Sequence, residues 1–182
     1  MALPGKMLGA HKMRRRMYAR SRSGSALIEF AIVAPVFFLL LFGIIETGLV
    51  FFASTALENA TNDAARLIRT GQAQSASMTQ AAFRTQVCNE ITPLLACDSN
   101  LQIDVESYSG FGSANFVAPT TSGSLNQNLN NFSPGNAGDV VLVRTFYTWS
   151  VLTPLLQPFL ANLSNGKHLI NATAAFRNEP YS

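Results

Sequence analysis

Glu29 is the residue whose position most needs a chemical explanation, because it follows Gly24 by five residues at the start of an apolar stretch. A charge inside a bilayer costs up to about 3 kcal/mol on insertion scales. Hydrolysis of the peptide bond after Gly24 would give Ser25 a free α-amino group. Ser25 and Glu29 are spaced i, i+4, which places them on one face of a helix. The spacing therefore predicts a processing site at Gly24 and Ser25 that supplies Glu29 with a cation, in the same subunit or in its neighbour.

Cys88 and Cys97 are the two cysteines of the chain, and both follow the apolar stretch. If the N-terminus lies in the cytoplasm, both cysteines lie outside it, where disulfides form and persist. The alternative is a pair of reduced, buried thiols. The C-x8-C spacing without a nearby histidine argues against a zinc site. We expect a disulfide that closes a loop of about ten residues, worth roughly 2–3 kcal/mol on the chain-entropy model.

Motifs for catalysis, such as GxSxG, HExxH or a P-loop, are not found in the sequence. Of the two histidines, His11 lies in the basic leader and His168 begins an expected strand. Asp104 and Glu106 could hold a metal, but their alternation with apolar residues favours a solvated strand face. We therefore expect a protein that is not an enzyme and that binds no cofactor and no metal.

The basic residues are concentrated at the N-terminus. Seven of the 13 Lys and Arg residues precede Glu29, the first acidic residue, and the chain from Ser25 onward has 6 basic and 10 acidic residues, a balance of −4. Nucleic-acid binding would use such a cluster. The apolar stretch that follows at once favours a role in membrane topology, with the basic end in the cytoplasm.

The apolar stretch has three interpretations. Residues 30–45 carry no charge, and apolar character resumes at residues 49–53. A secretory signal peptide has a shorter apolar region of about 7–15 residues. A plain signal anchor explains the length and the charge asymmetry but leaves Glu29 without a partner. A prepilin-type signal, with a basic leader, a glycine and a glutamate before an apolar helix, explains all three features.

Two further residues interrupt the apolar stretch. Pro35 removes one backbone hydrogen bond and should kink the helix, which membrane helices tolerate. Glu46 follows the uncharged residues, and we expect an interfacial carboxylate at the outer membrane face, or a polar contact between subunits. A hydrocarbon core needs only about 20 helical residues, so residues 49–52 should lie beyond it and need another cover.

The rest of the chain predicts a small α+β domain. Leu57, Ala60, Ala64, Leu67 and Ile68 recur at helical spacing, so the membrane helix should continue until Gly71. Thr153 is expected to cap a short helix that begins at Pro154. The other expected elements are a helix over residues 79–92, strands over 101–108, 139–151 and 167–177, and a long Gly/Ser/Asn-rich loop over 109–138, which is functional or flexible.

The segments "GSALIEFAIVAPVFFLLLFGIIETG", "VVLVRTFYTWSVLTPLL" and "TAAFRNEPY" resemble the TadE-like family of tight-adherence (Flp) pilus assembly proteins. The resemblance implies a pseudopilin or minor pilin of a type IVb-like pilus, processed by a prepilin peptidase after Gly24. Glu29 would then set the register of the subunit in the assembly. The resemblance does not separate TadE from TadF. Alternative translation starts at Met7, Met13 and Met17 would shorten the leader.

The expected organisation is a basic cytoplasmic leader (residues 1–24), a transmembrane and extended pilin-like helix (25–70) and a small periplasmic α+β domain (71–182). The domain should contain the second helix and an antiparallel sheet of about three strands. The resemblance implies a single-pass protein of the bacterial inner membrane. Its partners would be a prepilin peptidase, other pilin-like subunits, the inner-membrane assembly platform and membrane lipid, but no nucleic acid. The rival interpretation is a signal-anchored periplasmic binding module that uses residues 109–138 as its contact surface.

Overall fold

The computed structural model describes residues 22–92 and 95–181. The expected leader, residues 1–24, therefore lies almost entirely outside the described residues. The chain forms two compact units, Met1–Phe38 and Leu39–Ser182, and each is described by itself.

The described part of the first unit is the beginning of helix α1, which runs from Arg22 to Arg69 and contains Pro35. Its large apolar side chains are exposed, for example Leu27 at 69% and Ile32 at 70%. Within the described part of the chain, one helix is long and apolar enough to cross a membrane, judged by length and composition. A helix that is apolar on all sides needs a lipid or protein environment, so the predicted membrane helix is supported. The predicted kink at Pro35 stays a prediction.

In the second unit, α1 buries one face against a sheet. The helical spacing expected there is confirmed for Leu57, Ala60, Ala64 and Ile68, which are at most 3% exposed, whereas Leu67 is only half-buried. Full burial of a leucine or isoleucine side chain contributes about 1.5–3 kcal/mol. This face, rather than intrinsic helix propensity, therefore holds α1 to the domain.

Three long strands form the sheet in the order β1-β4-β5, and all neighbours are antiparallel. Strand β1 is Leu101–Tyr108, β4 is Val140–Ser150 and β5 is Lys167–Arg177. The expected α+β class with three antiparallel strands is confirmed. Strand β4 is central, and its residues from Val140 to Tyr147 are all buried. It therefore reads as a nearly continuous apolar run rather than as an alternating one.

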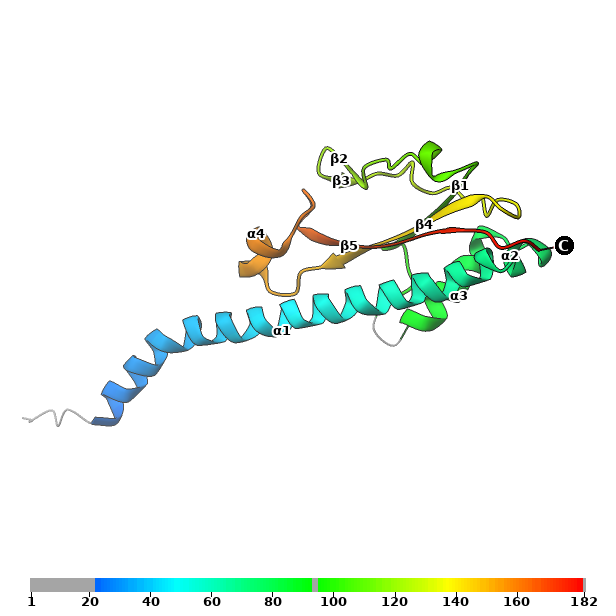
Figure 1. Cartoon of the computed structure of the whole chain (residues 1–182). Helices are drawn as coiled ribbons and strands as arrows, with labels where there is room; N and C mark the ends of the chain where they lie inside the picture. Colours follow the sequence, from blue (N-terminus) through cyan, green and yellow to red (C-terminus); the bar gives the residue numbers. More distant parts are fainter. Residues whose placement is uncertain (1–21, 93–94, 182) are drawn as a thin grey trace, which may run out of the picture. The chain divides into compact units, whose positions relative to one another are not determined.

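The two faces of the sheet have different covers (Figure 1). Helices α1 and α3 (Gln80–Ile91) cover one face and share with it the larger apolar core. The chain between β1 and β4 covers the other face, where a smaller core contains Leu129, Phe146, Leu163 and Leu169. This covering segment includes the 3-10 helix η1 (Phe111–Ser113) and the short strands β2 (Thr120–Thr121) and β3 (Ser124–Leu125), which pair with each other.

Helix α3 begins where the sequence places it. The hydroxyl of Thr79 accepts a hydrogen bond from the backbone N–H of Ala82, at 3.2 Å. Such an N-cap is worth about 1 kcal/mol. The side chains of Phe83, Val87 and Ile91 are completely buried, so the expected i, i+4 stripe faces the core.

The short helices after β4 begin at Pro154, as expected. The 3-10 helix η2 (Pro154–Leu156) leads into α4 (Gln157–Leu160). The Thr153 side chain makes no capping hydrogen bond, so the expected side-chain cap is wrong. The backbone N–H of Thr153 instead donates a hydrogen bond to the Glu46 carboxylate of α1.

Gly71 ends the long helix in a left-handed conformation. Its φ is 77°, and the four-residue helix α2 (Gln72–Ser75) follows at once. A Cβ atom at position 71 would lie 2.4 Å from the Cγ atom of Tyr181, near the C-terminus. The absence of a side chain is therefore needed twice, for the backbone conformation and for the aromatic ring packed on it.

Substitution Gly71→Ala should lower the free energy of unfolding by more than the roughly 1–2 kcal/mol of a left-handed alanine, because the Tyr181 ring must also move. Denaturant titration of the full chain in detergent, followed by Trp149 fluorescence, measures the loss. Gly48→Ala is the matched control, since Gly48 lies in α1 with no atom within 4 Å of a new Cβ. Equal unfolding midpoints for the two variants would contradict this account.

Candidate functional site

Ser25 and Glu29 lie within hydrogen-bond distance in the first unit. The Ser25 hydroxyl donates to the Glu29 carboxylate, with 3.0 Å between Oγ and Oε1. Both residues belong to the first turns of α1 and are exposed. Gly24 precedes them in the same helix, and no atom lies within 4 Å of the position that a Cβ would occupy there. The i, i+4 arrangement therefore exists in the uncut chain, while processing after Gly24 stays a prediction.

Glu46, in the second unit, has a different environment from the one expected. It is 2% exposed, and its carboxylate accepts hydrogen bonds from the backbone N–H groups of Leu152 and Thr153, the latter at 3.0 Å. Both donors come from the segment that follows β4. The expected contact between subunits is not what satisfies this carboxylate, because its partners are backbone groups of its own chain, while its place at the outer membrane face stays a prediction.

Backbone donors of this kind suit a buried carboxylate. Two N–H groups that converge on a carboxylate compensate the cost of removing the charge from water. In return, Glu46 satisfies two donors just ahead of Pro154, which has no N–H of its own. Sequence reasoning missed this pairing because the partners are 106 and 107 residues away from Glu46. The sequence signal that could have indicated the pairing was an acidic residue inside an apolar helix, together with an apolar, proline-containing segment whose backbone N–H groups needed acceptors.

An apolar groove extends from this contact along α1. Leu156 packs on Gly43, with its Cδ1 atom 3.5 Å from the position of a Cβ at residue 43. A Cβ atom at position 43 would make ordinary van der Waals contact with this side chain, so the segment lies close against the helix. The groove is lined by Leu39, Leu40, Gly43, Ile44, Thr47, Leu156, Phe159 and Leu160.

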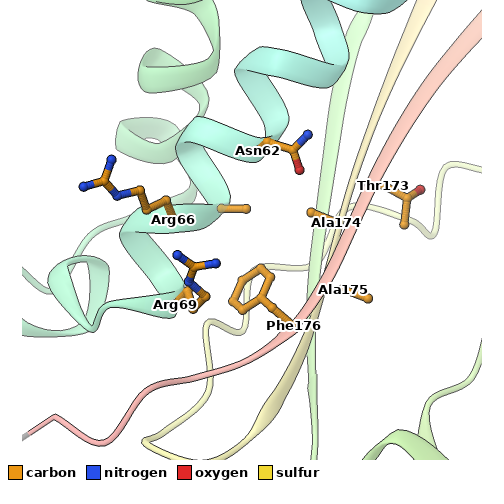
Figure 2. Close-up of a pocket in the computed structure, with 8 residues that line it drawn as sticks. Asn62, Arg66, Arg69, Thr173, Ala174, Ala175 and Phe176 are labelled. Carbon is orange, nitrogen blue, oxygen red and sulfur yellow. The ribbon is translucent and has the colours of Figure 1, made fainter.

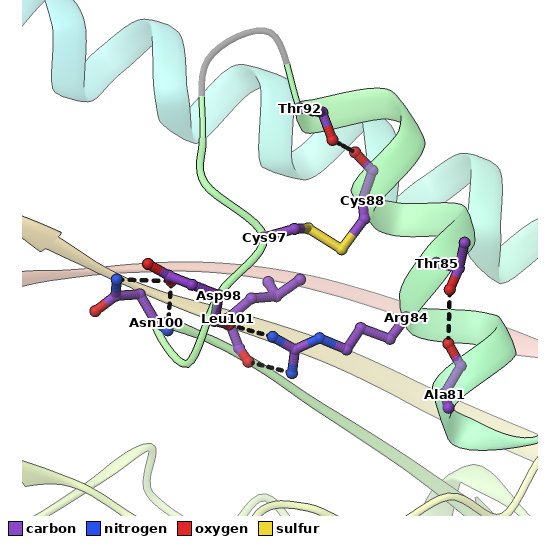
Figure 3. The surroundings of a disulfide bond; sticks show 9 residues. All are labelled: Ala81, Arg84, Thr85, Cys88, Thr92, Cys97, Asp98, Asn100 and Leu101. Atoms are coloured by element: carbon purple, nitrogen blue, oxygen red, sulfur yellow. Dashed lines mark hydrogen bonds between the residues drawn. A yellow bond between two sulfur atoms is a disulfide. The ribbon is translucent and has the colours of Figure 1, made fainter.

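The expected disulfide joins Cys88 on α3 to Cys97 on the loop that leads to β1, with 5.7 Å between the Cα atoms. Figure 3 shows Arg84, one turn before Cys88, reaching the same loop. Its guanidinium donates to the backbone oxygens of Asp98 and, at 2.9 Å, of Leu101. The covalent bond and the arginine therefore fix the entry into the sheet from two sides.

A buried ion pair lies on the opposite face of the sheet. Arg144 of β4 donates through Nε and Nη2 to one carboxylate oxygen of Asp104 in β1, at 3.1 and 2.6 Å. Asp104 is completely buried, so the expectation of a solvated acid pair is wrong for this residue. Glu106 is half-buried, and its Oε1 atom lies 3.8 Å from Nη2 of Arg144. The predicted alternation of β1 is confirmed, but its polar face is covered by another part of the chain.

Residues 109–138 provide that cover. Asn131 donates to Asp104 from its backbone and its side-chain nitrogens, at 3.0 and 3.2 Å, and Arg144 donates to the backbone oxygen of Val117 at 2.9 Å. Ladder-like bonds also link Val105 to Asn131 and Ser133, each at 2.9 Å. The segment is thus hydrogen-bonded to the edge and the face of the sheet, and its flexibility stays a prediction.

A groove between α1 and β5 has a basic rim (Figure 2). Arg66 and Arg69 project from α1, and Phe176 of β5 lies opposite Arg69. The Arg69 guanidinium lies 3.4 Å from the Glu179 carboxylate, with both side chains about half exposed. An exposed pair of this kind contributes little to stability, so it gives no reason to assign a function to the groove.

The titratable groups with shifted pKa values have local causes. Removal from water raises the pKa of Tyr108, Tyr147 and Tyr181. The hydrogen bond from the backbone N–H of Asn100 lowers the pKa of Asp98. These directions keep all four groups in their ordinary charge state at neutral pH. They provide no general acid or base near pH 7.

The described residues give little support to a metal site or to a catalytic histidine. Over residues 22–92 and 95–181, no group of three His, Cys, Asp or Glu side chains could hold a metal. His168 has its Nδ1 atom in hydrogen-bond contact with the backbone oxygen of Leu160. That contact holds α4 to the start of β5 and explains His168 as a packing residue.

Comparison with known proteins relates the first part of the chain to one family. Residues 24–66 match the family model described as TadE-like protein. This match confirms the resemblance inferred from the sequence over most of α1, including the segment that contains Gly24, Glu29 and Glu46. No curated protein and no solved structure matches the chain.

Substitution Glu46→Gln should lower the free energy of unfolding by about 1–3 kcal/mol, because a single amide oxygen replaces two carboxylate oxygens and one N–H loses its acceptor. Denaturant titration of the full chain in detergent would measure this loss. Glu58→Gln is the matched control, because Glu58 is an exposed carboxylate on the same helix. If both variants unfold at the wild-type midpoint, Glu46 does not hold the segment as described.

Proposed function

Because residues 24–66 match the TadE-like family model, we propose that this chain is a pseudopilin- or minor-pilin-like component needed to assemble a tight-adherence pilus. It acts as a structural protein and not as an enzyme. A prepilin peptidase hydrolyses the bond between Gly24 and Ser25. The observation that carries the proposal is the Ser25–Glu29 contact at the start of an exposed apolar helix.

The processing step changes the charge around Glu29. Water adds across the Gly24–Ser25 bond and leaves a carboxylate on Gly24 and an α-amino group on Ser25. An α-amino group has an ordinary pKa of about 7.7–8.0, so it is mostly protonated at neutral pH. The Ser25 hydroxyl already lies 3.0 Å from the Glu29 carboxylate, so the new cation forms within reach of it. The positive end of the helix dipole adds to this attraction.

The location follows from charge and sulfur chemistry. The leader carries most of the basic residues and stays in the cytoplasm by the positive-inside rule. The domain beyond the apolar helix contains a disulfide, which fits an oxidising periplasm. The protein is accordingly a single-pass protein of the bacterial inner membrane with a periplasmic domain.

The partners are those that an apolar helix with a register-setting carboxylate requires. The exposed side chains of the first unit contact lipid before assembly and the helices of other pilin-like subunits or the inner-membrane platform after it. Glu29 sets the register, because a carboxylate in an apolar environment is stable only beside a cation, in its own subunit or the next.

A signal-anchored periplasmic binding module is the alternative function. Two large aromatic side chains in residues 109–138 favour it, since Phe111 is 64% and Phe116 68% exposed. Exposed aromatic residues are common at binding surfaces. This function would need the loop and would not need the processed N-terminus.

Mass spectrometry of the protein recovered from its native membrane should find a chain that begins at Ser25. Gly24→Leu should leave the leader attached, because a larger side chain alters the residue before the cut. Gly24 has open space around it, so this variant should still fold. An intact leader on functional wild-type protein would contradict the proposed processing.

The two functions separate in a pilus-formation and adherence assay. Glu29→Gln keeps the size of the side chain but cannot form an ion pair, so pilus formation should fall to a background level while the protein remains in the membrane. Glu58→Gln, a solvent-exposed carboxylate of the same helix, is the control and should assemble normally. Normal pili with Glu29→Gln, together with loss of adherence on deletion of residues 109–138, would favour the binding module.

A further inference from the structure

The segment of residues 152–160 exposes three large apolar side chains that the domain does not cover. Leu152 is 65%, Leu155 73% and Phe159 83% exposed. No charged residue occurs between Arg144 and Lys167. Large exposed apolar side chains that lie close together in the chain indicate a contact with a membrane or with a protein.

The attachment of this segment to α1 sets its level relative to the bilayer. A hydrocarbon core is spanned by about 20 helical residues, and 20 residues counted from Gly24 end at Gly43. Leu156 packs directly on Gly43, and Glu46 binds the backbone of Leu152 and Thr153 one turn further along. The segment is therefore held beside the end of the apolar span and not in the body of the domain.

We propose that residues 152–160 form a second membrane-contact element, which lies in the outer leaflet at the periplasmic face of the inner membrane. The side chains of Leu152, Leu155 and Phe159 face the acyl chains, and Glu46 holds the element on α1. The domain then sits directly on the bilayer. This inference rests on the proposed function only in requiring α1 to cross the membrane.

Unpaired N–H groups are costly in a lipid environment, and several backbone positions of the segment avoid them. Pro154 and Pro158 have no N–H to satisfy. The N–H groups of Leu152 and Thr153 bond to Glu46. The remaining turn is closed by bonds from Leu156 to the backbone oxygen of Thr153 and from Gln157 to that of Pro154.

Lipid is favoured over a protein partner by continuity and by charge. The groove beside the segment is lined by α1 residues Leu39, Leu40 and Ile44, which belong to the uncharged stretch of the span. Whatever surrounds this end of the span therefore also contacts Leu156 and Phe159. The uncharged segment offers no side-chain charge to orient a specific partner, whereas an interfacial helical turn needs only apolar area.

The proposal can be tested with a single tryptophan as a depth probe. Trp149 is the only tryptophan of the chain, and its buried Nε1 has no hydrogen-bond partner, so Trp149→Phe removes no hydrogen bond. In that background, Phe159→Trp is compared with Phe116→Trp, a control on another exposed phenylalanine, in residues 109–138. Phe37→Trp reports on the span itself.

Each full-length variant is reconstituted in phospholipid vesicles, with and without bromines near the headgroup end of the acyl chains. The Phe159→Trp emission should fall about twofold with brominated lipid, as for a side chain at the bilayer interface, while the Phe116→Trp emission should not change. For both variants, the emission with brominated lipid relative to that with unbrominated lipid should stay the same when less protein is reconstituted per lipid, since lipid contact does not depend on other copies.

The outcomes separate the inference from the proposed function. Quenching of Phe37→Trp without quenching of Phe159→Trp overturns the membrane contact and leaves the membrane helix intact. A blue-shifted but unquenched Phe159→Trp emission shows that protein covers the side chain, and this result also overturns the inference. If dilution of the protein in lipid reverses the blue shift, the covering protein is a second copy of the chain. If Phe37→Trp is unquenched, α1 does not cross the membrane, and both proposals fail.

Discussion

The hydrogen bonds from the backbone of Leu152 and Thr153 to the Glu46 carboxylate determine how residues 152–160 are attached to α1. Without them the helix would carry a buried, unpaired charge, which costs several kcal/mol. With them, the carboxylate becomes a fixed acceptor between the apolar part of α1 and the part packed on the sheet. The packing of Leu156 on Gly43 depends on the same attachment.

Glu46 and Glu29, two acidic residues of α1, thus obtain their hydrogen-bond partners in different ways. Glu46 obtains its partners by folding, because the chain returns to it more than 100 residues later. Among the described residues, the hydrogen-bond partner of Glu29 is the Ser25 hydroxyl. Under the proposed function its second partner appears through proteolysis. Glu46 thus serves the fold of one molecule, whereas under the proposed function Glu29 is the acid available for contacts in the assembly.

The polar face of the sheet follows the same physical rule. Asp104 and Arg144 are buried together, and Asn131 and Val117 of the covering segment complete their hydrogen bonds. A buried ion pair contributes little net stability, but loss of either partner would leave an uncompensated charge. The Gly/Ser/Asn-rich composition of residues 109–138 is therefore compatible with a defined cover, because its short polar side chains and backbone groups supply the required bonds.

The sequence by itself determined the long apolar helix, the three strands, the second helix and the cysteine pair, since these depend on local periodicity, charge and spacing. It also placed Ser25 and Glu29 on one face, because four residues fix that geometry in any helix. Only the tertiary structure decided the partners of Glu46 and Asp104 and the attachment of residues 152–160. Whether a carboxylate is solvated or buried with partners depends on the groups that pack against it. Here those groups lie 27 to 107 residues away in the sequence. No local pattern encodes a contact over that separation, because chain topology rather than residue spacing brings the groups together.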